Sequence, residues 1–339
     1  MNPRPPLKAR LTPFEKRFLE RCKTRGLIEK GDRVLIALSG GSDSVALLKL
    51  LRAVQPYLKL SLAAAHCNFQ LRGKESDDDE AFCQALCQSL GIECFAKKFD
   101  AALVAAREKT SIEETARNLR YRWFAELMRE RGFNKLATAH QRNDNAETIL
   151  FNLFRGASLL GLAGIPERRG DIIRPALHLT REDLRNYLAE TNSPFRDDSS
   201  NASLDFDRNF IRLRVIPLIE ERFGSKFLQN LSRLSENAAE LQAFVESHIE
   251  KLSRRKGLSF KNDSFDVAAL KRLTAFEQKE LFKRALAKFG IEPSAQALSR
   301  LAGLLNAQSG RKIALSARVE AVWKKDRLMF VAKDSSRPT

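Results

Sequence analysis

The sequence predicts an α/β protein: a Rossmann-like parallel sheet of about five strands with helices on both faces, followed by a mostly helical C-terminal region. Three features lead to this prediction. Short apolar runs alternate with amphipathic helical patterns up to about residue 155, the order that strand–helix–strand units produce. A glycine pair joins the first apolar run to the first helical pattern, as in turns that bind phosphate. After residue 156, helical patterns dominate.

The elements expected before residue 155 follow one another in strand–helix order. The predicted strands span residues 34–38, 60–65, 92–95 and 136–138. The predicted helices span residues 44–54, 75–90, 112–131 and 144–154. Parallel sheets bind ligands at the carboxyl ends of their strands. We therefore expect the functional motifs, which lie at or just after these ends, to share one site.

The chain changes character after Gly156. A glycine-rich turn leads to a helix that starts near Thr180, a polar segment over 191–209 and helical patterns from 210 to about 256. Another helical pair begins near residue 265, and the alternation after residue 311 predicts a terminal hairpin. We place the domain boundary near Pro217, between a catalytic domain of residues 1–216 and a C-terminal region of residues 217–339.

The composition of the 339-residue chain bounds the class of protein. With 43% hydrophobic and 30% charged residues, the chain can form two domains with a sizeable core. We find no signal peptide and no apolar run near the roughly 18 residues of a membrane helix. The five scattered cysteines fit a reducing compartment, and we expect Cys67, Cys83 and Cys87 to be small buried apolar residues. The sequence therefore predicts a cytoplasmic protein.

The charge is strongly positive. The chain carries 59 Lys and Arg against 42 Asp and Glu, a net charge of +17. Residues 216–339 hold 23 of the basic and 14 of the acidic side chains, so the C-terminal region is the more basic part. Such a surplus indicates a polyanionic partner, most commonly nucleic acid. A basic solvated surface without a partner is the alternative.

The turn after the first strand has the sequence Ser-Gly-Gly-Ser-Asp-Ser over residues 39–44. Gly40 and Gly41 let the backbone approach an anion beside the free N–H groups of the helix start. Hydroxyl donors come from Ser39, Ser42 and Ser44. Asp43 suits this place if a Mg²⁺ ion lies between it and phosphate, or if it caps the helix. The turn lacks the lysine of G-x-x-x-x-G-K-[ST], so it is not the usual NTPase loop.

The hexapeptide resembles the SGGxDS loop of PP-loop ATP pyrophosphatases, enzymes with the fold of adenine nucleotide α-hydrolases. These enzymes cleave ATP between the α and β phosphates. The resemblance implies that the loop grips the departing pyrophosphate while the adenylyl group goes to a substrate oxygen. No lysine aimed at a γ-phosphate is then needed.

Four later segments resemble motifs of the tRNA(Ile)-lysidine synthase family. "AHCNFQLRG" is similar to HxNHxLR and keeps His66, Asn68, Leu71 and Arg72, but has Phe69 in place of the second histidine. "SIEETARNLRYRWF" is similar to E-x-x-A-R-x-x-R-Y through Glu113 or Glu114, Arg117, Arg120 and Tyr121.

The other two segments lie later in the chain. The first begins in the fourth predicted strand, and the second follows the helix that starts near Thr180. "ATAHQRNDNAET" resembles TAHHxDDxxET and keeps His140, Asp144, Glu147 and Thr148, with Gln141 and Asn143 as departures. "FRDDSSNASLDFDRNFIRLRVIP" resembles R-x-D-x-S-N…R-N-x-I-R-x-x-x-x-P and keeps Arg196, Asp198, Ser200, Asn201, Arg208, Asn209, Arg212 and Pro217. Together with the loop, these motifs cover the first two thirds of the chain.

The resemblance implies a ligase. It would adenylate O2 of the wobble cytidine in a CAU anticodon with ATP and Mg²⁺, after which the ε-amine of free lysine displaces AMP at C2 and gives lysidine. The partners implied are isoleucine tRNA with a CAU anticodon and free L-lysine. The basic C-terminal region would hold the tRNA backbone, while the reacting base leaves its stack. The oligomeric state stays open, a homodimer included.

The resemblance also implies roles for individual residues. The catalytic residues would be Asp43, Asp144 and Arg208, with Asp43 also a metal ligand. ATP would be bound by residues 39–44, His66 and Arg117. Lysine or tRNA would be bound by His140, Arg72, Arg196, Asn209 and Arg212.

Several of these residues have structural alternatives. Asp144 can position the attacking lysine and accept its proton, or cap the following helix through D-N-A-E. Since a carboxylate has two oxygens, the two roles are compatible. His140 can polarise a substrate or bond a backbone carbonyl. Arg117 and Arg120 can be surface residues, and Arg196 can belong to a polar turn.

Arg208 and Arg212 lie four residues apart on a predicted helix and therefore on one face. Such a pair suits phosphate or developing negative charge. The alternative is a solvated helix on which they pair with Asp205 or Asp207.

Three other readings compete with the ligase. Thiolation of a tRNA base would call for a catalytic cysteine pair, but the chain has no CxxC, and its closest pair is Cys83-x-x-x-Cys87 within a predicted helix. An amidating ligase would need an amidotransferase domain or subunit and would leave the basic tail unexplained. A non-catalytic RNA-binding relative would tolerate changes in the loop, and all six loop positions are intact.

Overall fold

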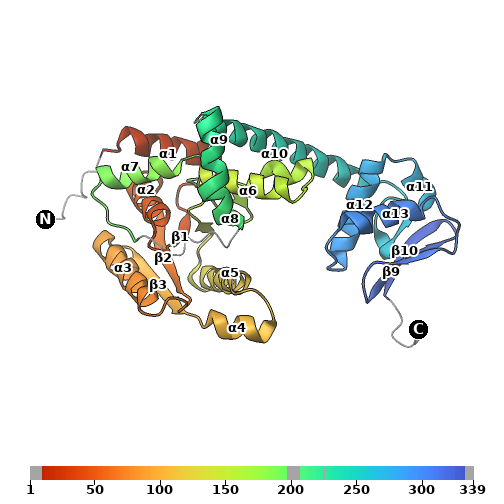
Figure 1. Cartoon of the computed structure of the whole chain (residues 1–339), viewed down its shortest axis with the longest axis horizontal. Coiled ribbons are helices and arrows are strands. Elements are labelled where there is room, and N and C mark those ends of the chain that lie inside the picture. The colour runs from red at the N-terminus through yellow and green to blue at the C-terminus, as the bar shows by residue number, and fades with distance from the viewer. Residues whose placement is uncertain (1–9, 197–206, 225, 333–339) are drawn as a thin grey trace. The chain divides into compact units, whose positions relative to one another are not determined.

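The computed structural model describes residues 10–196, 207–224 and 226–332 (Figure 1). The chain separates into two compact units, residues 1–239 and 240–339. None of the described helices is long and apolar enough to span a membrane.

The first unit is built on a six-stranded sheet with the order β3-β2-β1-β4-β6-β5. Its strands are β1 (Arg33–Ala37), β2 (Ser61–Asn68), β3 (Glu93–Lys98), β4 (Lys135–Ala137), β5 (Arg168–Arg169) and β6 (Ile172–Ile173). All neighbours run parallel except β5 and β6. The predicted parallel sheet of about five strands is confirmed. The two-residue strands β5 and β6 are too short to produce a periodic signal in the sequence.

Helices surround this sheet and continue to the end of the unit. They are α1 (Pro13–Thr24), α2 (Ser42–Leu58), α3 (Lys74–Leu90), α4 (Ala101–Glu108), α5 (Ile112–Arg131), α6 (Arg142–Phe154), α7 (Arg181–Glu190), α8 (Asp207–Phe210) and α9 (Ile216–Phe223), with the 3-10 turn η1 (Leu159–Ala163) and the π-helical segment η3 (Ile211–Val215). The helix α10 (Lys226–Ser253) continues into the second unit. Helices α1 and α4 are not among the predicted elements, although Thr12 and Glu15 form a capping box at the start of α1.

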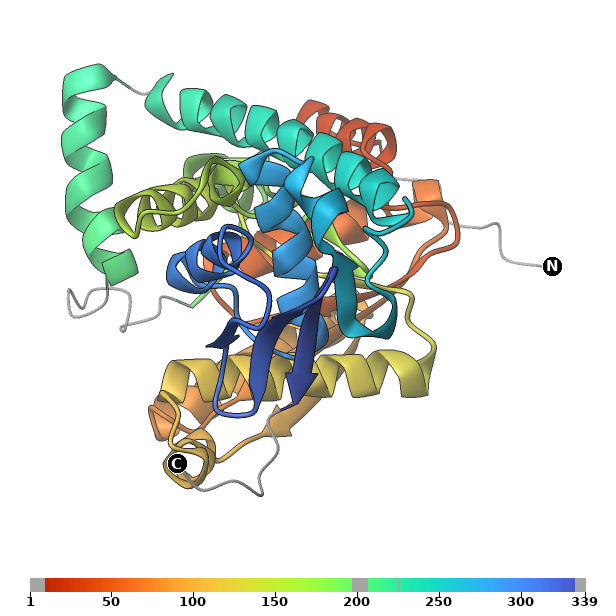
Figure 2. The same cartoon turned by 90° about the vertical axis from the view of Figure 1, so that its right-hand side faces the viewer.

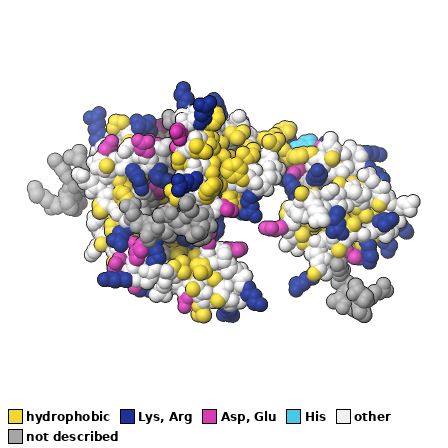
Figure 3. All heavy atoms as spheres, in the orientation of Figure 1, with side chains coloured by type: hydrophobic (Ala, Val, Ile, Leu, Met, Phe, Trp, Pro, Cys, Tyr) yellow, Lys and Arg dark blue, Asp and Glu magenta, His cyan; other side chains and the backbone are white. Residues whose placement is uncertain are grey.

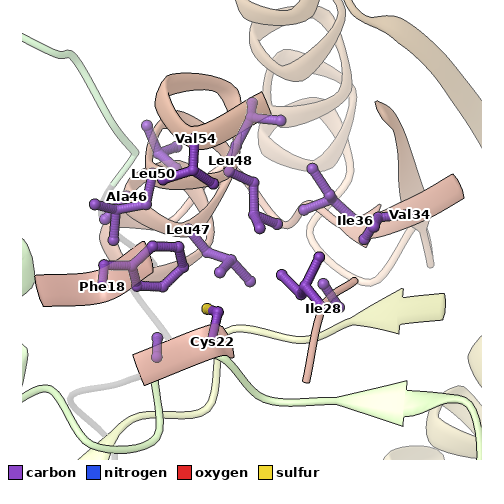
Figure 4. Close-up of a cluster of buried hydrophobic side chains, with 14 of the residues drawn as sticks. Phe18, Cys22, Ile28, Val34, Ile36, Ala46, Leu47, Leu48, Leu50 and Val54 are labelled. Carbon is purple, nitrogen blue, oxygen red and sulfur yellow. The ribbon is translucent and has the colours of Figure 1, made fainter. Parts of the chain in front are cut away.

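Apolar side chains pack on both faces of the sheet, as predicted. Val34 and Ile36 of β1 belong to a cluster with α1, α2 and α7, whereas Leu35 packs on Trp123 and Phe124 of α5. This alternation follows from the two-residue period of a strand. Figure 4 shows part of the first cluster, including Phe18, Cys22, Ile28 and Leu47.

The order of the strands creates one crevice at the carboxyl edge of the sheet. The chain proceeds from β1 to β2 and β3, then crosses to the other side of β1 to form β4. The turns after β1 and β4 therefore lie at the point where the strand order reverses, and open α/β sheets bind ligands at such a point. These turns carry the Ser39–Ser44 hexapeptide, referred to below as the phosphate loop, and the segment around His140.

The second unit combines helices with an antiparallel sheet of order β7-β10-β9-β8. Its elements are η4 (Lys261–Asp263), β7 (Ser264–Asp266), α11 (Val267–Lys271), α12 (Ala275–Lys288), α13 (Ala295–Leu304), β8 (Lys312–Ala314), β9 (Val319–Lys324) and β10 (Arg327–Ala332). The predicted terminal hairpin is β9–β10, whose strands lie side by side in Figure 2. The three-residue strands β7 and β8 extend it to four strands.

The division between the units falls within α10, later than the boundary placed near Pro217. Packing explains the difference. Ile216 of α9 and Leu228 of α10 share one buried cluster with Leu150 of α6. Further along α10, Ser235 accepts a hydrogen bond from the Asn145 side chain at 3.3 Å. The start of α10 therefore belongs to the first unit.

Candidate active site

The phosphate loop is held in shape by its own hydroxyls. The Ser44 hydroxyl donates to the Gly41 carbonyl at 2.9 Å and accepts from the Ser39 N–H at 3.2 Å. Gly41 is the N-cap of α2 and makes no side-chain cap bond, so the N–H groups at the start of α2 remain directed at the loop. Asp43 is the second residue of α2, and the alternative in which it is the N-cap is wrong.

Gly40 is required at its position for two reasons. Its φ of 91° lies in the region that only glycine adopts readily. A Cβ at this position would also lie 3.3 Å from the Cys83 Sγ and 3.8 Å from the Arg196 Cγ. The Arg196 N–H donates to the Gly40 carbonyl at 2.9 Å. The loop is therefore clamped between α3 and the segment that follows α7.

A cavity of about 560 Å³ opens at the loop. It receives side chains from the turns after β1 and β4, from α3, α5 and α7, and from the π-helical segment η3. The predicted site residues in its lining are Ser39, Gly41, Ser42, Asp43, Ser44, Arg72, His140, Asp144, Arg196 and Arg212. A more open hollow of about 740 Å³ beside α7, between Arg185 and Phe195, has no carboxylate among its described lining residues.

Asp144 combines a cap with a place in the cavity. The helix α6 begins at Arg142, earlier than predicted, so Asp144 is its third residue and Gln141 is the N-cap. One carboxylate oxygen of Asp144 accepts the Gln141 N–H at 3.0 Å, and the other lies 3.5 Å from the Arg212 Nη2. The expected D-N-A-E box is therefore not formed: Asp144 is the N3 member of a capping box with Gln141, and its other oxygen faces Arg212 in the cavity.

Arg212 is fixed by a second acid, Glu147, which sequence analysis did not assign to the site. The Arg212 Nε and Nη2 donate to the two Glu147 oxygens at 2.7 and 2.9 Å. Glu147 is 3% exposed, and Arg181 lies 3.5 Å from one of its oxygens. The spacing of Asp144 and Glu147, three residues apart on one helix, was the available signal. The bidentate pair fixes the Arg212 guanidinium beside Asp144.

Asp43 and Asp144 form an electrostatically strained pair. Burial and the charge of Asp144 raise the pKa of Asp43, while Arg181 lowers it. Burial also raises the pKa of Asp144, against the hydrogen bond from the Gln141 N–H and the charges of Arg181 and Arg212. A cation between the carboxylates would relieve this strain. Mg²⁺ uses one or two carboxylates together with substrate phosphates, so the residues present fit that ion.

His140 is uncharged at neutral pH. Burial lowers its pKa to about 4, and the nearby Arg174, Arg117 and Arg208 act in the same direction. The Nδ1 atom lies 3.0 Å from the Thr138 hydroxyl. A neutral imidazole in the cavity can accept or donate a hydrogen bond without adding a positive charge.

Arg72 and Arg196 share one acid on α3. The Arg72 Nη2 lies 2.6 Å from one Asp79 oxygen, and the Arg196 Nε donates to the other at 3.0 Å. Asp79 is 7% exposed and lines the cavity. Asp79 is not among the predicted site residues because it lies within the acidic run Asp77–Glu80, and only the packing of α3 decides which of these acids faces inward.

Five predicted residues lie outside the lining that the described residues form: Gly40, His66, Arg117, Arg208 and Asn209. His66 is buried, and its Nδ1 lies 2.9 Å from the Leu38 carbonyl oxygen, which supports the strand before the loop. Arg117 is exposed with its guanidinium 5.1 Å from the Tyr121 ring centroid. One turn later, Arg120 lines the cavity instead. The predicted motif residues Asp198, Ser200 and Asn201, and the alternative partner Asp205, lie outside the described residues.

The three departures from the family motifs have structural roles. Gln141 caps α6 by accepting the Asn143 N–H at 2.6 Å. Asn143 accepts the Arg181 N–H at 3.2 Å and thereby joins α6 to α7. Phe69 stacks on Phe99, with ring centroids 5.5 Å apart.

Of the three cysteines expected to be buried, two are. Cys83 and Cys87 are fully buried, and Cys67 is half-buried at the cavity wall. Burial raises the pKa of Cys67 to about 12 and also raises that of Cys83. These thiols therefore stay protonated at neutral pH, the form in which cysteine is a poor nucleophile.

The comparisons with known proteins agree with this geometry. Residues 11–219 match a family described as the PP-loop domain. The fold and the loop thus define a PP-loop ATP-using enzyme. The tRNA(Ile)-lysidine synthase of Chlorobaculum tepidum is 48% identical over 309 residues, which cover 91% of this chain and 93% of that protein. The chain belongs to the tRNA(Ile)-lysidine synthase family, whose members are ATP-using ligases.

Other relatives differ in length or only share the fold. The tRNA(Ile)-lysidine synthase of Thermosipho africanus is 43% identical over 239 residues, covering 70% of this chain and 55% of that protein. The chain therefore spans about half the length of such longer relatives. A solved U34-tRNA thiolase from Methanococcus maripaludis, carrying a [4Fe-4S] cluster, superposes with a TM-score of 0.55 at 18% identity over 67% of this chain and 79% of that chain. That likeness shows the fold alone.

Proposed function

We propose that the chain ligates free lysine to C2 of the wobble cytidine of isoleucine tRNA with a CAU anticodon. ATP is converted to AMP and pyrophosphate, and the product is lysidine. The observation that carries the proposal is the convergence of the phosphate loop, the Asp43–Asp144 pair and the fixed Arg212 on one cavity. Family membership supplies the substrate class, since the curated relatives are named for tRNA(Ile).

In the activation step, O2 of the cytidine attacks the α-phosphorus of ATP. The bond from that phosphorus to the bridging oxygen of pyrophosphate breaks. The N–H groups at the start of α2 and the serines of the phosphate loop would bind the departing pyrophosphate. Asp43 would hold a Mg²⁺ ion, which would neutralise charge on the phosphates when bound.

In the transfer step, the ε-amine of lysine attacks C2 and the C2–O2 bond to AMP breaks. The amine must be deprotonated, and Asp144 is the base we assign, because its raised pKa suits proton transfer. Arg212 is kept by Glu147 at 3.5 Å from Asp144, where it would orient the carboxylate. Arg72, Arg196 and His140 would contact tRNA or lysine at the cavity wall.

The second unit would hold the tRNA backbone. Its described part includes exposed basic side chains on α12 and on the strands β8 and β9, such as Lys279, Lys312 and Lys324. This agrees with the basic surplus of the C-terminal residues. Binding of this kind is dominated by phosphate contacts and weakens with salt.

Pyrophosphate release is the direct test. It should require Mg²⁺ and tRNA with a CAU anticodon, and lysine should become attached to that tRNA. A tRNA with a CAC anticodon is the matched control and should give no lysine attachment. Release that needs a sulfur donor instead of lysine would indicate thiolation, and tight RNA binding without turnover would leave a binding protein.

Phe69 offers a test of the cavity wall. The Arg120 guanidinium lies 5.1 Å from the Phe69 ring centroid, and Arg120 lines the cavity. Replacing Phe69 with leucine should raise KM for ATP about two- to fivefold with little change in kcat, because a cation–π contact contributes ~0.5–1 kcal/mol. Phe69→Tyr should retain the wild-type KM.

The matched control for Phe69 is Phe133, whose ring lies 5.6 Å from the Arg33 guanidinium, at the start of β1. Phe133→Leu should leave KM unchanged. Equal KM values for wild type and Phe69→Leu would show that Arg120 is held without this ring.

A further inference from the structure

Two arginines from different elements lie against one aromatic ring. Phe151 of α6 is half-buried against the cluster that α6 forms with η3 and α10. The guanidinium carbon of Arg155, at the end of α6, lies 5.1 Å from the Phe151 ring centroid. That of Arg208, in α8, lies 5.6 Å away. Each guanidinium therefore makes a cation–π contact with the same ring, and their carbons lie at most 10.7 Å apart.

Within the described part of the chain, the two positive charges have no acidic partner. Both arginines are exposed, and no carboxylate of the described residues forms an ion pair with either of them. Like charges at such proximity repel, and an anion bound between them would remove the repulsion. The planar guanidinium presents paired donors that match the oxygens of a phosphate.

The pair lies next to the candidate active site. The charge of Arg208 lowers the pKa of both His140 and Asp144, which line the cavity. Arg212, four residues after Arg208, is itself in the lining. An anion held by the pair would therefore sit at the margin of the cavity rather than inside it.

Exposed aromatic side chains accompany the pair. Phe154 is 61% exposed and precedes Arg155, and Phe210 is 50% exposed and closely follows Arg208. Figure 3 shows hydrophobic side chains gathered on the surface along α8 and α9. Cations interleaved with exposed aromatic rings form the kind of surface on which single-stranded nucleic acid binds, through its phosphates and its base faces.

We propose that Arg155 and Arg208 together bind one backbone phosphate of the RNA strand that flanks the reacting base, with Phe151 as the support that orients both guanidinium groups. This inference rests on the proposed function, since it takes the substrate to be an anticodon loop. It assigns Arg208 to substrate binding beside the cavity. It also places an RNA contact in the first unit, outside the basic C-terminal region.

A purely structural explanation makes a different prediction. Arg155 is the C-cap residue of α6, where a positive charge stabilises the helix through its macrodipole. If this were its only role, Arg155→Gln would lower the unfolding temperature slightly and leave RNA binding unchanged.

The experiment measures binding of a CAU anticodon stem-loop RNA at several salt concentrations, without ATP or lysine. The variants are Arg155→Gln, Arg208→Gln and the double variant. We expect each single variant to weaken binding about three- to tenfold at low salt, and the slope of log affinity against log salt to fall by about 1. Because one phosphate is shared, the double variant should bind within about twofold of the single variants.

Arg131→Gln is the matched control. Arg131 is exposed, and its guanidinium lies 5.2 Å from the Phe95 ring centroid. The Arg131 carbonyl accepts a hydrogen bond from the Arg33 side chain at the start of β1. Arg131 therefore lies at the edge of the sheet opposite the cavity. This variant should bind the stem-loop RNA like wild type. Phe151→Leu keeps an apolar side chain but removes the ring, and should give an intermediate loss.

Two results would overturn the proposal. If both single variants keep the wild-type affinity and salt slope, the two arginines do not contact RNA. If the losses add in the double variant and the slope falls by about 2, the two arginines do not share one phosphate. Lysine attachment by the wild-type protein is measured in parallel. If attachment occurs and the variants bind normally, only this inference fails. If attachment is absent, the proposed function fails first.

Discussion

Asp43→Asn is expected to reduce CAU-tRNA-dependent pyrophosphate release at least about a thousandfold. That factor corresponds to ~4 kcal/mol of transition-state stabilisation, within the several kcal/mol that a bound metal ion supplies. The substitution keeps the shape of the side chain and removes the charge that would hold Mg²⁺. The measurement is single-turnover pyrophosphate release with saturating ATP. Pyrophosphate release within tenfold of wild type would show that Asp43 is not a Mg²⁺ ligand.

The same substitution should stabilise the free protein at neutral pH. Since its pKa is raised above the ordinary 3.8 by burial and by Asp144, Asp43 binds its proton more tightly in the folded than in the unfolded chain. The stability that this proton confers is present below the unfolded pKa and is lost as the pH rises through the folded pKa. Asp43→Asn should therefore unfold a few degrees higher than wild type at pH 7, and the difference should shrink as the pH falls.

Added Mg²⁺ separates the two effects of Asp43. It should raise the unfolding temperature of wild type and leave that of Asp43→Asn unchanged, because only the wild-type side chain would bind the ion. Glu182→Gln is the matched control. Glu182 is the exposed second residue of α7, the position that Asp43 has in α2. It should match wild type in pyrophosphate release and in its response to Mg²⁺.

Asp144→Asn is expected to slow lysine transfer by about 10²- to 10⁴-fold, the range for loss of a general base. The formation of adenylated tRNA should be affected less, so a first-turnover burst of pyrophosphate should remain while lysine attachment falls. Asp144 must be ionised to act as the base, and its pKa is raised. We therefore expect the rate of lysine transfer to fall at low pH with an apparent pKa above 3.8, the ordinary pKa of an aspartate. Equal losses in both steps would show that Asp144 acts in activation.

Asp183 provides a close control for Asp144. It is the third residue of α7, and its carboxylate accepts the Thr180 N–H at 2.8 Å in a capping box. Asp144 makes the equivalent bond to Gln141 in α6 at 3.0 Å. Asp183→Asn should cost a comparable part of the stability, about 1 kcal/mol for a cap, with lysine transfer at the wild-type rate. The difference between the two variants then measures chemistry separately from capping.

The predicted site residues that line the cavity were found from local geometry. The phosphate loop is a strand, two glycines and a helix start within a dozen residues, and each of these leaves a local signal. The four strands and four of the six helices before residue 155 were placed to within a few residues for the same reason. Asp144 was placed because it follows a strand whose carboxyl end must reach the crevice.

Other parts of the site depend on which side chains meet across the fold. The pairing of Arg212 with Glu147, the sharing of Asp79 by Arg72 and Arg196, and the position of Arg208 outside the cavity all join residues far apart in the chain. The two-residue strands β5 and β6 and the three-residue strands β7 and β8 also belong to this group, because ladder bonds to neighbouring strands define them rather than an apolar period.

The sequence by itself determined the class of fold, the phosphate loop and the family to which the chain belongs, because short local patterns of residues specify those properties. Only the tertiary structure decided which charged side chains face the cavity. A helical residue turns toward a cavity or toward solvent according to helix phase and to packing against partners tens of residues away. A change of one residue in phase rotates a side chain by about 100°, and no local pattern fixes that angle for a polar residue.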